Sequence, residues 1–386
     1  MFVPVFITLY TLMHAYLYVC ITAAIPLSTW QKTALILFFA AMIPLPLVAR
    51  RLERRGRERA ARIGAWISYL WMGSTFIFLA VSLLIRVCWW LLGLVARHSL
   101  FVSAGARTPF FASAVFTGFL VPYAFLERNR IRIEKVQLPT SKMLGGEDVV
   151  RIAQISDVHI GLMSGRRRVR RVIEALVRCQ PDVIVSTGDL VDAHLKAREE
   201  IAREFSRLTP RFGKFAVLGN HECYAGLAAS VRFIEQCGFV LLRNRSVRAG
   251  SLRIAGLDDP AAGWKAADEQ ALLSGPSARF TLLLKHRPEM LPESADRVDL
   301  QLSGHTHKGQ IFPFSLLTRI RYPAHAGLFR IGTAFLYVSR GTGSWGPPLR
   351  LFASPEITLI EIRSAPAISE PEPTPDLCSP AVAPWA

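Results

Sequence analysis

Long apolar runs fill the first third of the chain, and none of them contains Asp, Glu, Lys or Arg. They comprise residues 4–24, 33–49, 66–85 and 108–126. A helix needs about 20 apolar residues to cross the hydrocarbon core of a bilayer, with a lower limit of about 17. Three runs exceed this limit and residues 33–49 just reach it. The pattern therefore predicts a membrane domain, residues 1–127, with about four transmembrane helices.

Basic residues beside these runs predict an orientation. Residues 50–62 hold seven Arg and two Glu, and residues 127–135 hold three Arg and one Lys against two Glu, whereas residues 97–107 carry only two Arg. Lys and Arg accumulate on the cytoplasmic side of membrane helices. We therefore expect a multi-pass protein of the inner (cell) membrane whose N-terminus and C-terminal part are both cytoplasmic. If residues 87–96 form a separate crossing, the orientation reverses.

From about residue 148 the hydrophobic pattern changes its period. Apolar runs of strand length, such as residues 149–156, alternate with amphipathic segments at residues 169–179 and 194–208. This alternation predicts an α/β or α+β domain with a buried sheet over residues 148–363. Residues 364–386 are rich in Pro, Ala and Ser, so we expect a disordered tail.

Composition narrows the class of protein. Of the 386 residues, 51% are hydrophobic and 19% are charged, and the formal net charge is +17. These values exclude a disordered chain and fit poorly with a single soluble globule. The excess of basic residues indicates an anionic partner, which is a membrane, a phosphorylated ligand or a nucleic acid. The six cysteines form no C-x-x-C pair, which argues against a disulfide framework or a structural zinc site.

Side chains that can bind metal ions follow five of the predicted strands. They are Asp157 and His159, Asp189, Asn220 and His221, His286, and His305 and His307. In sheets covered by helices, ligands bind beyond the carboxyl ends of the strands. Each residue alone would most often be structural, but five such loops in one domain favour a common site.

The chemistry of this set favours two divalent metal ions. Carboxylate, amide and imidazole ligands suit Mn, Fe or Zn better than they suit a sulfur-rich centre. If one Asp bridges, two ions can each receive four protein ligands, hold a hydroxide between them and clamp a phosphoryl group. We also expect the two side chains of each Asp-x-His or His-x-His pair to leave an extended backbone on the same face.

The same residues carry a family resemblance. The blocks Asp157-x-His159, Gly188-Asp189, Asn220-His221-Glu222, His286 and His305-x-His307 stand in the order found in the calcineurin-like metallophosphoesterases. The resemblance covers about residues 148–363, and residues 341–348 look like the bacterial membrane-linked branch. It implies a metallophosphoesterase catalytic domain built as a β-sandwich flanked by helices.

The resemblance also implies roles for individual residues. Asp157, His159, Asp189 and His307 would hold the first metal ion. Asp189, Asn220, His286 and His305 would hold the second, with Asp189 as the bridge. His221 would be a catalytic residue that does not bind metal and assists the leaving oxygen.

The resulting prediction is a membrane-anchored phosphohydrolase that cleaves a phosphodiester or pyrophosphate bond by attack of the metal-bridged hydroxide. A lipid-linked substrate is a hypothesis based on the four adjacent membrane helices. One alternative is a membrane receptor or scaffold that binds a phosphorylated ligand without turnover. Another is a nucleic-acid phosphodiesterase, which is disfavoured because much of the positive charge flanks the membrane runs. The arginines at 166–171 are expected to bind phosphate or the leaflet, or to form a solvated helix start.

Overall fold

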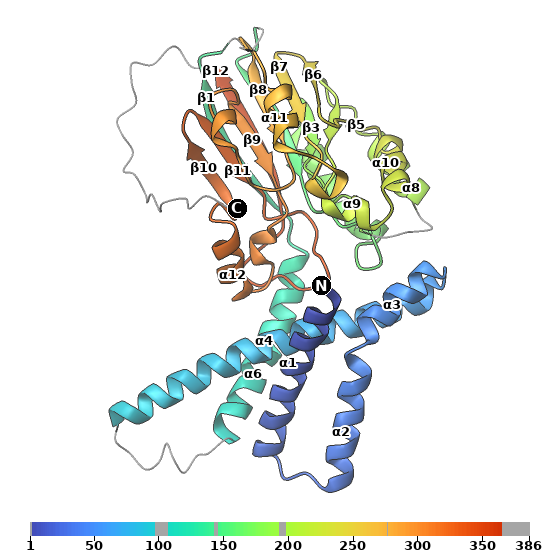
Figure 1. The fold of residues 1–386 in the computed structure, drawn as a ribbon, viewed down its shortest axis with the longest axis vertical. Helices are drawn as coiled ribbons and strands as arrows, with labels where there is room; N and C mark the ends of the chain where they lie inside the picture. The colour runs from blue at the N-terminus through green and yellow to red at the C-terminus, as the bar shows by residue number, and fades with distance from the viewer. Residues whose placement is uncertain (1, 97–106, 143–145, 193–197, 276, 365–386) are drawn as a thin grey trace.

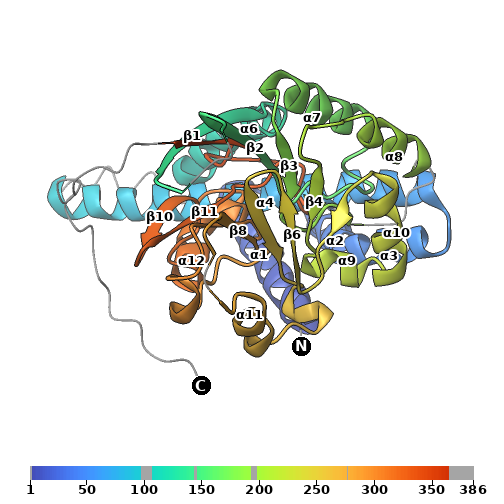
Figure 2. The ribbon, with the colours of Figure 1, turned by 90° about the horizontal axis from the view of Figure 1, so that it is seen from above.

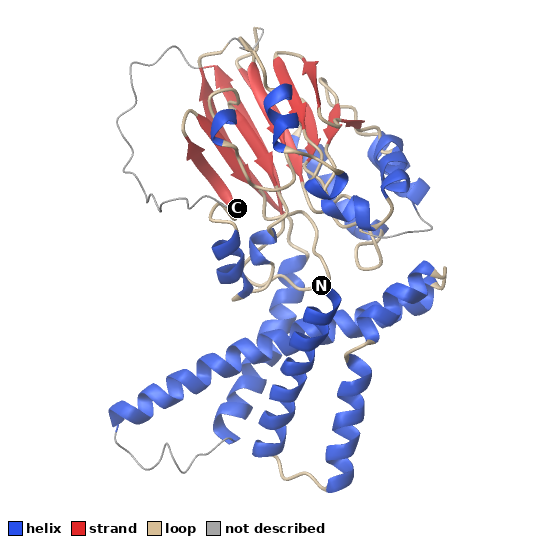
Figure 3. Cartoon of the chain, viewed as in Figure 1, coloured by secondary structure: helices blue, strands red, loops and turns tan. Residues whose placement is uncertain are grey.

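The computed structural model describes residues 2–96, 107–142, 146–192, 198–275 and 277–364. The expected tail beyond residue 364 and nearly all of the 97–107 connection lie outside the described residues. The described part contains apolar helices followed by two β-sheets (Figure 1; Figure 3).

Four helical segments of the described part are long and apolar enough to cross a membrane. They are α1 (Phe2–Ala24), α2 and α3 together (Thr29–Met42 and Leu45–Arg54), α4 (Glu58–Ala96) and α6 (Arg107–Arg128). Residues 87–96 continue α4 without a break, so they form no separate crossing. The N-terminus lies on the same side of the helices as the sheets (Figure 1), which agrees with an even number of crossings.

The apolar run at residues 33–49 is divided between two helices. Pro44 lies between α2 and α3, and Pro46 occupies the first turn of α3. Proline lacks a backbone N–H and is tolerated in the first turn of a helix but not in its interior. As a result α3 leaves the direction of α2 and runs beneath the short helix α9 (Asn220–Tyr224) (Figure 1).

The strands of the described part form two six-stranded sheets. In spatial order the first contains β1 (Arg132–Thr140), β12 (Glu356–Ser364), β2 (Val149–Ile155), β3 (Val183–Ser186), β4 (Lys214–Ala216) and β5 (Val240–Leu241). The second contains β10 (Gly327–Ile331), β11 (Ala334–Val338), β9 (Leu300–Ser303), β8 (Phe280–Leu284), β7 (Leu252–Gly256) and β6 (Arg245–Ala249). Because β1 pairs in parallel with β12, the first sheet begins before residue 148.

Helices cover the outer face of the first sheet. They are α7 (Arg166–Cys179), α8 (Arg198–Ser206) and α10 (Leu227–Gln236) (Figure 2). One apolar core, which includes Ile152 and Leu282, lies between the sheets. A second core, which includes Val172 and Phe205, lies between the first sheet and these helices. The expected β-sandwich flanked by helices is therefore confirmed. The short helices α11 (Ala266–Leu272) and α12 (Phe314–Arg321) belong to the second half of the sandwich.

The membrane helices are joined to the sandwich by more than the chain connection. Leu349 and Leu351 pack with Ile77 of α4 and Ala124 of α6. The backbone N–H of Arg350 donates to the carbonyl oxygen of Ala124 at 3.0 Å. These contacts hold the segment at residues 341–352 against both the membrane helices and the sandwich.

The end of α6 is buried in this junction. The Glu127 carboxylate accepts hydrogen bonds from the backbone N–H of Phe352 and the hydroxyl of Ser354. The Arg128 guanidinium donates to Ser344 and to the carbonyl oxygen of Met163. These two residues of the 127–135 segment are thus bound within the protein and do not form a free basic flank.

Candidate metal centre

Parallel strands deliver the candidate residues to one end of the sandwich. Strands β2, β3 and β4 are parallel neighbours in the first sheet, and β8 and β9 are parallel neighbours in the second. The candidates come directly after these five strands: Asp157 and His159, Asp189, Asn220 and His221, His286, and His305 and His307. The carboxyl ends of the strands lie toward the membrane helices (Figure 1). The structure thus brings all eight predicted residues to one region.

The backbone of these loops is not extended. Asp157, His159, Asp189, His305 and His307 have φ values of 52°, 50°, 53°, 72° and 50°. Left-handed backbone at a non-glycine residue costs about 1–3 kcal/mol and occurs where surrounding contacts impose it. Our expectation of an extended backbone at the Asp-x-His and His-x-His pairs is therefore wrong. Tight turns aim these side chains instead, and hydrogen bonds such as Asp157 N–H to the Gly188 carbonyl (3.0 Å) hold them.

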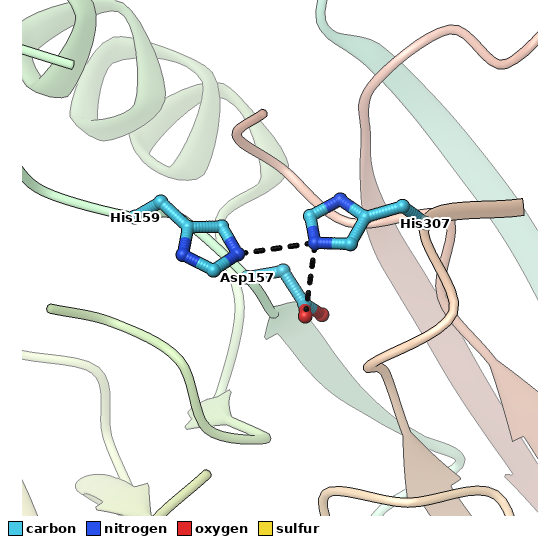
Figure 4. A group of neighbouring side chains, drawn as sticks. All are labelled: Asp157, His159 and His307. Carbon is cyan, nitrogen blue, oxygen red and sulfur yellow. Dashed lines mark hydrogen bonds and ion pairs between the residues drawn. The ribbon is translucent and has the colours of Figure 1, made fainter. Parts of the chain in front are cut away.

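Asp157, His159 and His307 form the first group of neighbouring side chains (Figure 4). Nε2 of His159 lies 3.0 Å from Nε2 of His307, and the latter atom lies 3.4 Å from Oδ1 of Asp157. Two nitrogens bound to one ion at about 2.1 Å lie about 3.0–3.4 Å apart at right or tetrahedral angles. The spacing of this group therefore fits one metal ion.

Asp189, His286 and His305 form a second group. Oδ2 of Asp189 lies 3.3 Å from Nε2 of His286, and that nitrogen lies 3.2 Å from Nδ1 of His305. The same Asp189 oxygen lies 3.9 Å from Nε2 of His159. The Asp189 carboxylate therefore stands between the two groups.

Asn220 adds an amide oxygen at the start of α9. Its Oδ1 atom is buried and has no hydrogen-bond partner within the described part of the chain. A buried polar atom without a partner is costly unless a ligand satisfies it. An amide oxygen, neutral imidazoles and carboxylates are together a donor set suited to divalent metals.

Electrostatics at the cluster also favour a cation. Burial lowers the pKa of His159 to about 4 and the pKa of His305 to about 3, so both imidazoles are neutral at physiological pH. Burial acts in the same direction on His286, but the Asp189 carboxylate outweighs it and raises the pKa of His286 to about 10. A proton on His286 thus supplies positive charge to a buried cluster that contains two carboxylates. A divalent ion would replace that charge.

His221 differs from the other histidines in its hydrogen bonds. Its Nδ1 atom lies 2.6 Å from Oδ1 of Asp192, and its backbone N–H donates to Oδ1 of Asp189 at 2.9 Å. Although burial lowers its pKa, the carboxylates of Asp189 and Asp192 raise the pKa of His221 to about 9. With Nδ1 bonded to Asp192, Nε2 is the atom that can present a proton to a substrate.

Asp192, Glu222 and Arg350 support the site, and sequence reasoning did not assign these roles. Asp192 lies three residues after Asp189, and this spacing is the signal that could have identified it. The buried Glu222 carboxylate accepts hydrogen bonds from the backbone N–H groups of Asp189, Val191 and Gly219. The fully buried Arg350 donates to Nδ1 of His307 at 3.0 Å and to carbonyl oxygens around it.

Four of the five arginines at 166–171 form hydrogen bonds or ion pairs within the described part of the protein. Arg171 donates to Oδ1 of Asn129 at 3.3 Å. Arg166 and Arg170 pair with Glu204 on α8, and Arg168 is buried and donates to the carbonyl oxygens of Arg128 and Thr342. Arg168 fits neither of the expectations, which were contact with phosphate or the leaflet and a solvated helix start. Its role is to join α7 to the end of α6.

A β-sandwich whose strand ends bring together carboxylates, an amide and imidazoles is compatible with a metal-dependent phosphoesterase. The family model for calcineurin-like phosphoesterases matches residues 150–309. A metallophosphoesterase of Aquifex aeolicus is 36% identical over 250 residues, which cover 62% of this chain and 95% of the relative. The chain therefore belongs to the calcineurin-like phosphoesterase family, and it is a metal-dependent phosphoesterase.

Two other relatives are longer than the region they share with this chain. A metallophosphoesterase of Helicobacter pylori is 34% identical and a transmembrane protein with metallophosphoesterase domain from Danio rerio is 28% identical. The matches cover 55% and 68% of this chain, and 60% and 65% of those proteins. The apolar helices together with the transmembrane relatives indicate a membrane protein.

Proposed function

We propose that this protein is a membrane-anchored phosphohydrolase with two divalent metal ions, and that it cleaves a phosphodiester or pyrophosphate bond of a lipid-linked substrate. In this proposal the membrane domain comprises residues 1–127, and the catalytic domain comprises residues 148–363 together with β1. The observation that carries the proposal is the position of the Asp189 carboxylate between two groups of metal-binding side chains.

The chain offers each ion a set of four ligands, with Asp189 shared. Asp157, His159, Asp189 and His307 would hold one ion. Asp189, Asn220, His286 and His305 would hold the other. When bound, two such ions lower the pKa of water and neutralise charge on phosphoryl oxygens. The nitrogen and oxygen donors suit Mn, Fe or Zn.

The remaining chemistry belongs to His221 and Asp192. Asp192 accepts the Nδ1 proton of His221 and so fixes the orientation of the ring. The proton at Nε2 is then available to the oxygen that leaves phosphorus. After the transfer, the neutral imidazole keeps its hydrogen bond to Asp192, which holds it ready for a second proton.

One feature supports a lipid-linked substrate, and another supports a cytoplasmic catalytic domain. The strand ends that carry the site lie toward the membrane helices (Figure 1), so the reacting bond would lie near the headgroup layer. The arginine-rich residues 50–62 connect the second and third crossings on the side of the catalytic domain. By the positive-inside rule, that side is the cytoplasm.

The test is hydrolysis of bis(p-nitrophenyl) phosphate by the detergent-purified full chain with Mn²⁺, Zn²⁺, Fe²⁺ or a chelator. We expect metal-dependent turnover, two bound ions per chain by elemental analysis, and loss of both in Asp189→Asn. Asp148→Asn, at the opposite end of β2, is the matched control. Two bound ions without turnover of any phosphoester would instead favour the receptor or scaffold. A C-terminal reporter that is active only outside the inner membrane would overturn the orientation.

A further inference from the structure

A cavity of about 400 Å³ lies between the membrane helices and the candidate metal centre. Arg50, Glu53 and Arg54 of α3 and Tyr69 of α4 line it on one side. His159 and Asp192 line it on the other side. We call it the headgroup cavity. It therefore extends from a proposed metal ligand to a helix of the membrane domain.

The side contributed by α3 carries two cations and an unsatisfied acceptor. Arg50 is exposed, and its Nε donates to the Tyr69 hydroxyl at 3.3 Å. Arg54 is exposed and has no ion pair within the described residues. Oε1 of Glu53 is buried without a hydrogen-bond partner there. Such a surface fits a ligand that brings an anionic group together with a hydroxyl donor.

Charged groups on the two sides of the cavity interact electrostatically. Arg50 and Glu53 both interact electrostatically with Asp192, the partner of His221. A ligand in this cavity would thus contact α3 while its other end lies beside the groups that perform the chemistry. Apolar side chains of Leu162 and Met163 line the same cavity.

We propose that the headgroup cavity binds the polar end of a lipid that carries two anionic groups and at least one hydroxyl. The scissile phosphoryl group lies at the metal centre beside His159. The second anionic group pairs with Arg50 and Arg54, and the hydroxyl donates to Glu53. This assignment rests on the proposed function and names the substrate class of that site.

A lipid is favoured over a soluble organophosphate because of where the arginines are. Both lie on α3, directly after the second apolar segment, where the polar headgroups of a bilayer begin. A soluble substrate would not require its recognition residues on a membrane helix.

The experiment measures affinity and does not depend on turnover. The full chain in nanodiscs, loaded with Mn²⁺ and carrying His221→Ala to prevent hydrolysis, is titrated calorimetrically with two probes. One is CDP-dioctanoylglycerol, a water-soluble lipid pyrophosphate with ribose hydroxyls. The other is CDP-glycerol, which has the same polar end without acyl chains.

We expect tighter binding of the acylated probe, and a loss of about tenfold or more in Arg50→Gln/Arg54→Gln because two charge-assisted hydrogen bonds are removed. The matched control is Arg51→Gln/Arg55→Gln, which removes the same charge from residues outside the cavity. Equal losses in both double variants, or no loss in either, would overturn the site. Equal affinity for both probes would overturn the lipid assignment. Failure of the wild-type protein to hydrolyse the aryl diester would contradict the proposed function and leave this comparison valid.

A separate observation concerns α12 in the catalytic domain. Its residues Leu316, Leu317 and Ile320 are 58%, 59% and 78% exposed. Phe314, at the start of the same helix, contacts Phe76 of α4 with ring centroids 6.3 Å apart. Figure 1 shows α12 below the sheets and beside the membrane helices. Large apolar side chains left in water are unfavourable by about 25 cal/mol per Å² of exposed apolar area.

We infer that these apolar residues of α12 insert into the bilayer interface, because the contact with α4 places them next to a transmembrane segment. Hydroxyl-radical footprinting of the wild-type protein in nanodiscs tests this inference. Leu316, Leu317 and Ile320 should be oxidised several-fold more slowly than Val177, which is 58% exposed on α7 away from the membrane helices. Equal oxidation rates at α12 and Val177 would overturn the inference.

Discussion

Nδ1 of His221 lies 2.6 Å from Oδ1 of Asp192. Asp192 follows strand β3 and lines the headgroup cavity, whereas His221 lies in α9, which follows strand β4. Asp192 thus links the proposed proton donor to the side of the site that faces α3. His221 also lies close to the metal-binding side chains, since its Nε2 atom is 3.9 Å from Oδ2 of Asp189 and it forms a third possible metal-binding group with His159 and Asp189. Its hydrogen bond to Asp192 is what distinguishes it as the proposed proton donor.

Asp192→Asn should lower activity by about tenfold to a hundredfold, because His221 loses the carboxylate that orients its ring and helps raise its pKa. A proton donor is active below its pKa, so the alkaline fall in kcat should move to lower pH in the variant. The loss should be larger for an alkyl phosphodiester than for a p-nitrophenyl diester, whose leaving group needs little help from an acid. A pH–rate profile with both substrates measures this, and an equal loss with both would contradict the role of Asp192.

Glu222→Gln should destabilise the loops that carry the ligands. The carboxylate accepts three backbone N–H groups, and a glutamine side chain has a single carbonyl oxygen with which to replace both carboxylate oxygens. Leaving one buried donor without a partner costs about 1–3 kcal/mol. We expect Tm to fall by several degrees in differential scanning fluorimetry. Glu235→Gln, an exposed residue of α10, should leave Tm unchanged.

Arg350→Lys should destabilise the protein and weaken metal binding. The fully buried guanidinium bonds to Nδ1 of His307 and to the carbonyl oxygens of Gly343 and Arg340, and an ammonium cannot reproduce this fork. We expect a loss of about 2–4 kcal/mol in the free energy of unfolding, as several buried acceptors lose partners. Denaturant unfolding and bound-metal analysis measure the two effects. Arg363→Lys, in a half-exposed pair with Glu361, is the matched control.

The membrane helices, a domain of alternating strands and helices, and the eight clustered residues are predicted from the sequence because each depends on a local pattern. The arrangement of the strands in a sandwich was implied only by the family resemblance. Apolar runs set the membrane helices, and polar residues directly after strand-length runs must reach the ends of a sheet. The five segments converge because their strands are parallel to their neighbours in each sheet. Metal-binding residue types directly after predicted strands were therefore enough to predict the cluster.

What the sequence does not predict depends on contacts between distant residues. The parallel pairing of β1 with β12 joins segments more than two hundred residues apart, so the start of the first sheet could not be read locally. The left-handed backbone at Asp157 and His307 occurs at residues that are not glycine, so the sequence carries no sign of it and surrounding contacts impose it. Likewise, the sequence around Glu127 and Arg128 is typical of the polar flank of a membrane helix. Their burial depends on hydrogen bonds to residues 344–354, which are distant in the sequence.

Removal of metal should destabilise the protein more at high pH than at low pH. Without metal, the folded protein holds a proton on His286 up to a pKa of about 10, whereas an unfolded histidine releases it near pH 6.5. Between these values the folded apo protein binds more protons than the unfolded chain, so its stability falls as pH rises. The metal-loaded protein carries a metal ion in place of this proton and should not lose stability in this way.

We therefore expect the difference in Tm between protein with excess Mn²⁺ and protein with EDTA to widen from pH 6.5 to pH 8.5. In Asp189→Asn the carboxylate that raises the pKa of His286 is absent, so the difference should be small at every pH. A difference that is large but constant with pH in the wild-type protein would contradict the exchange of a proton for a metal ion at His286.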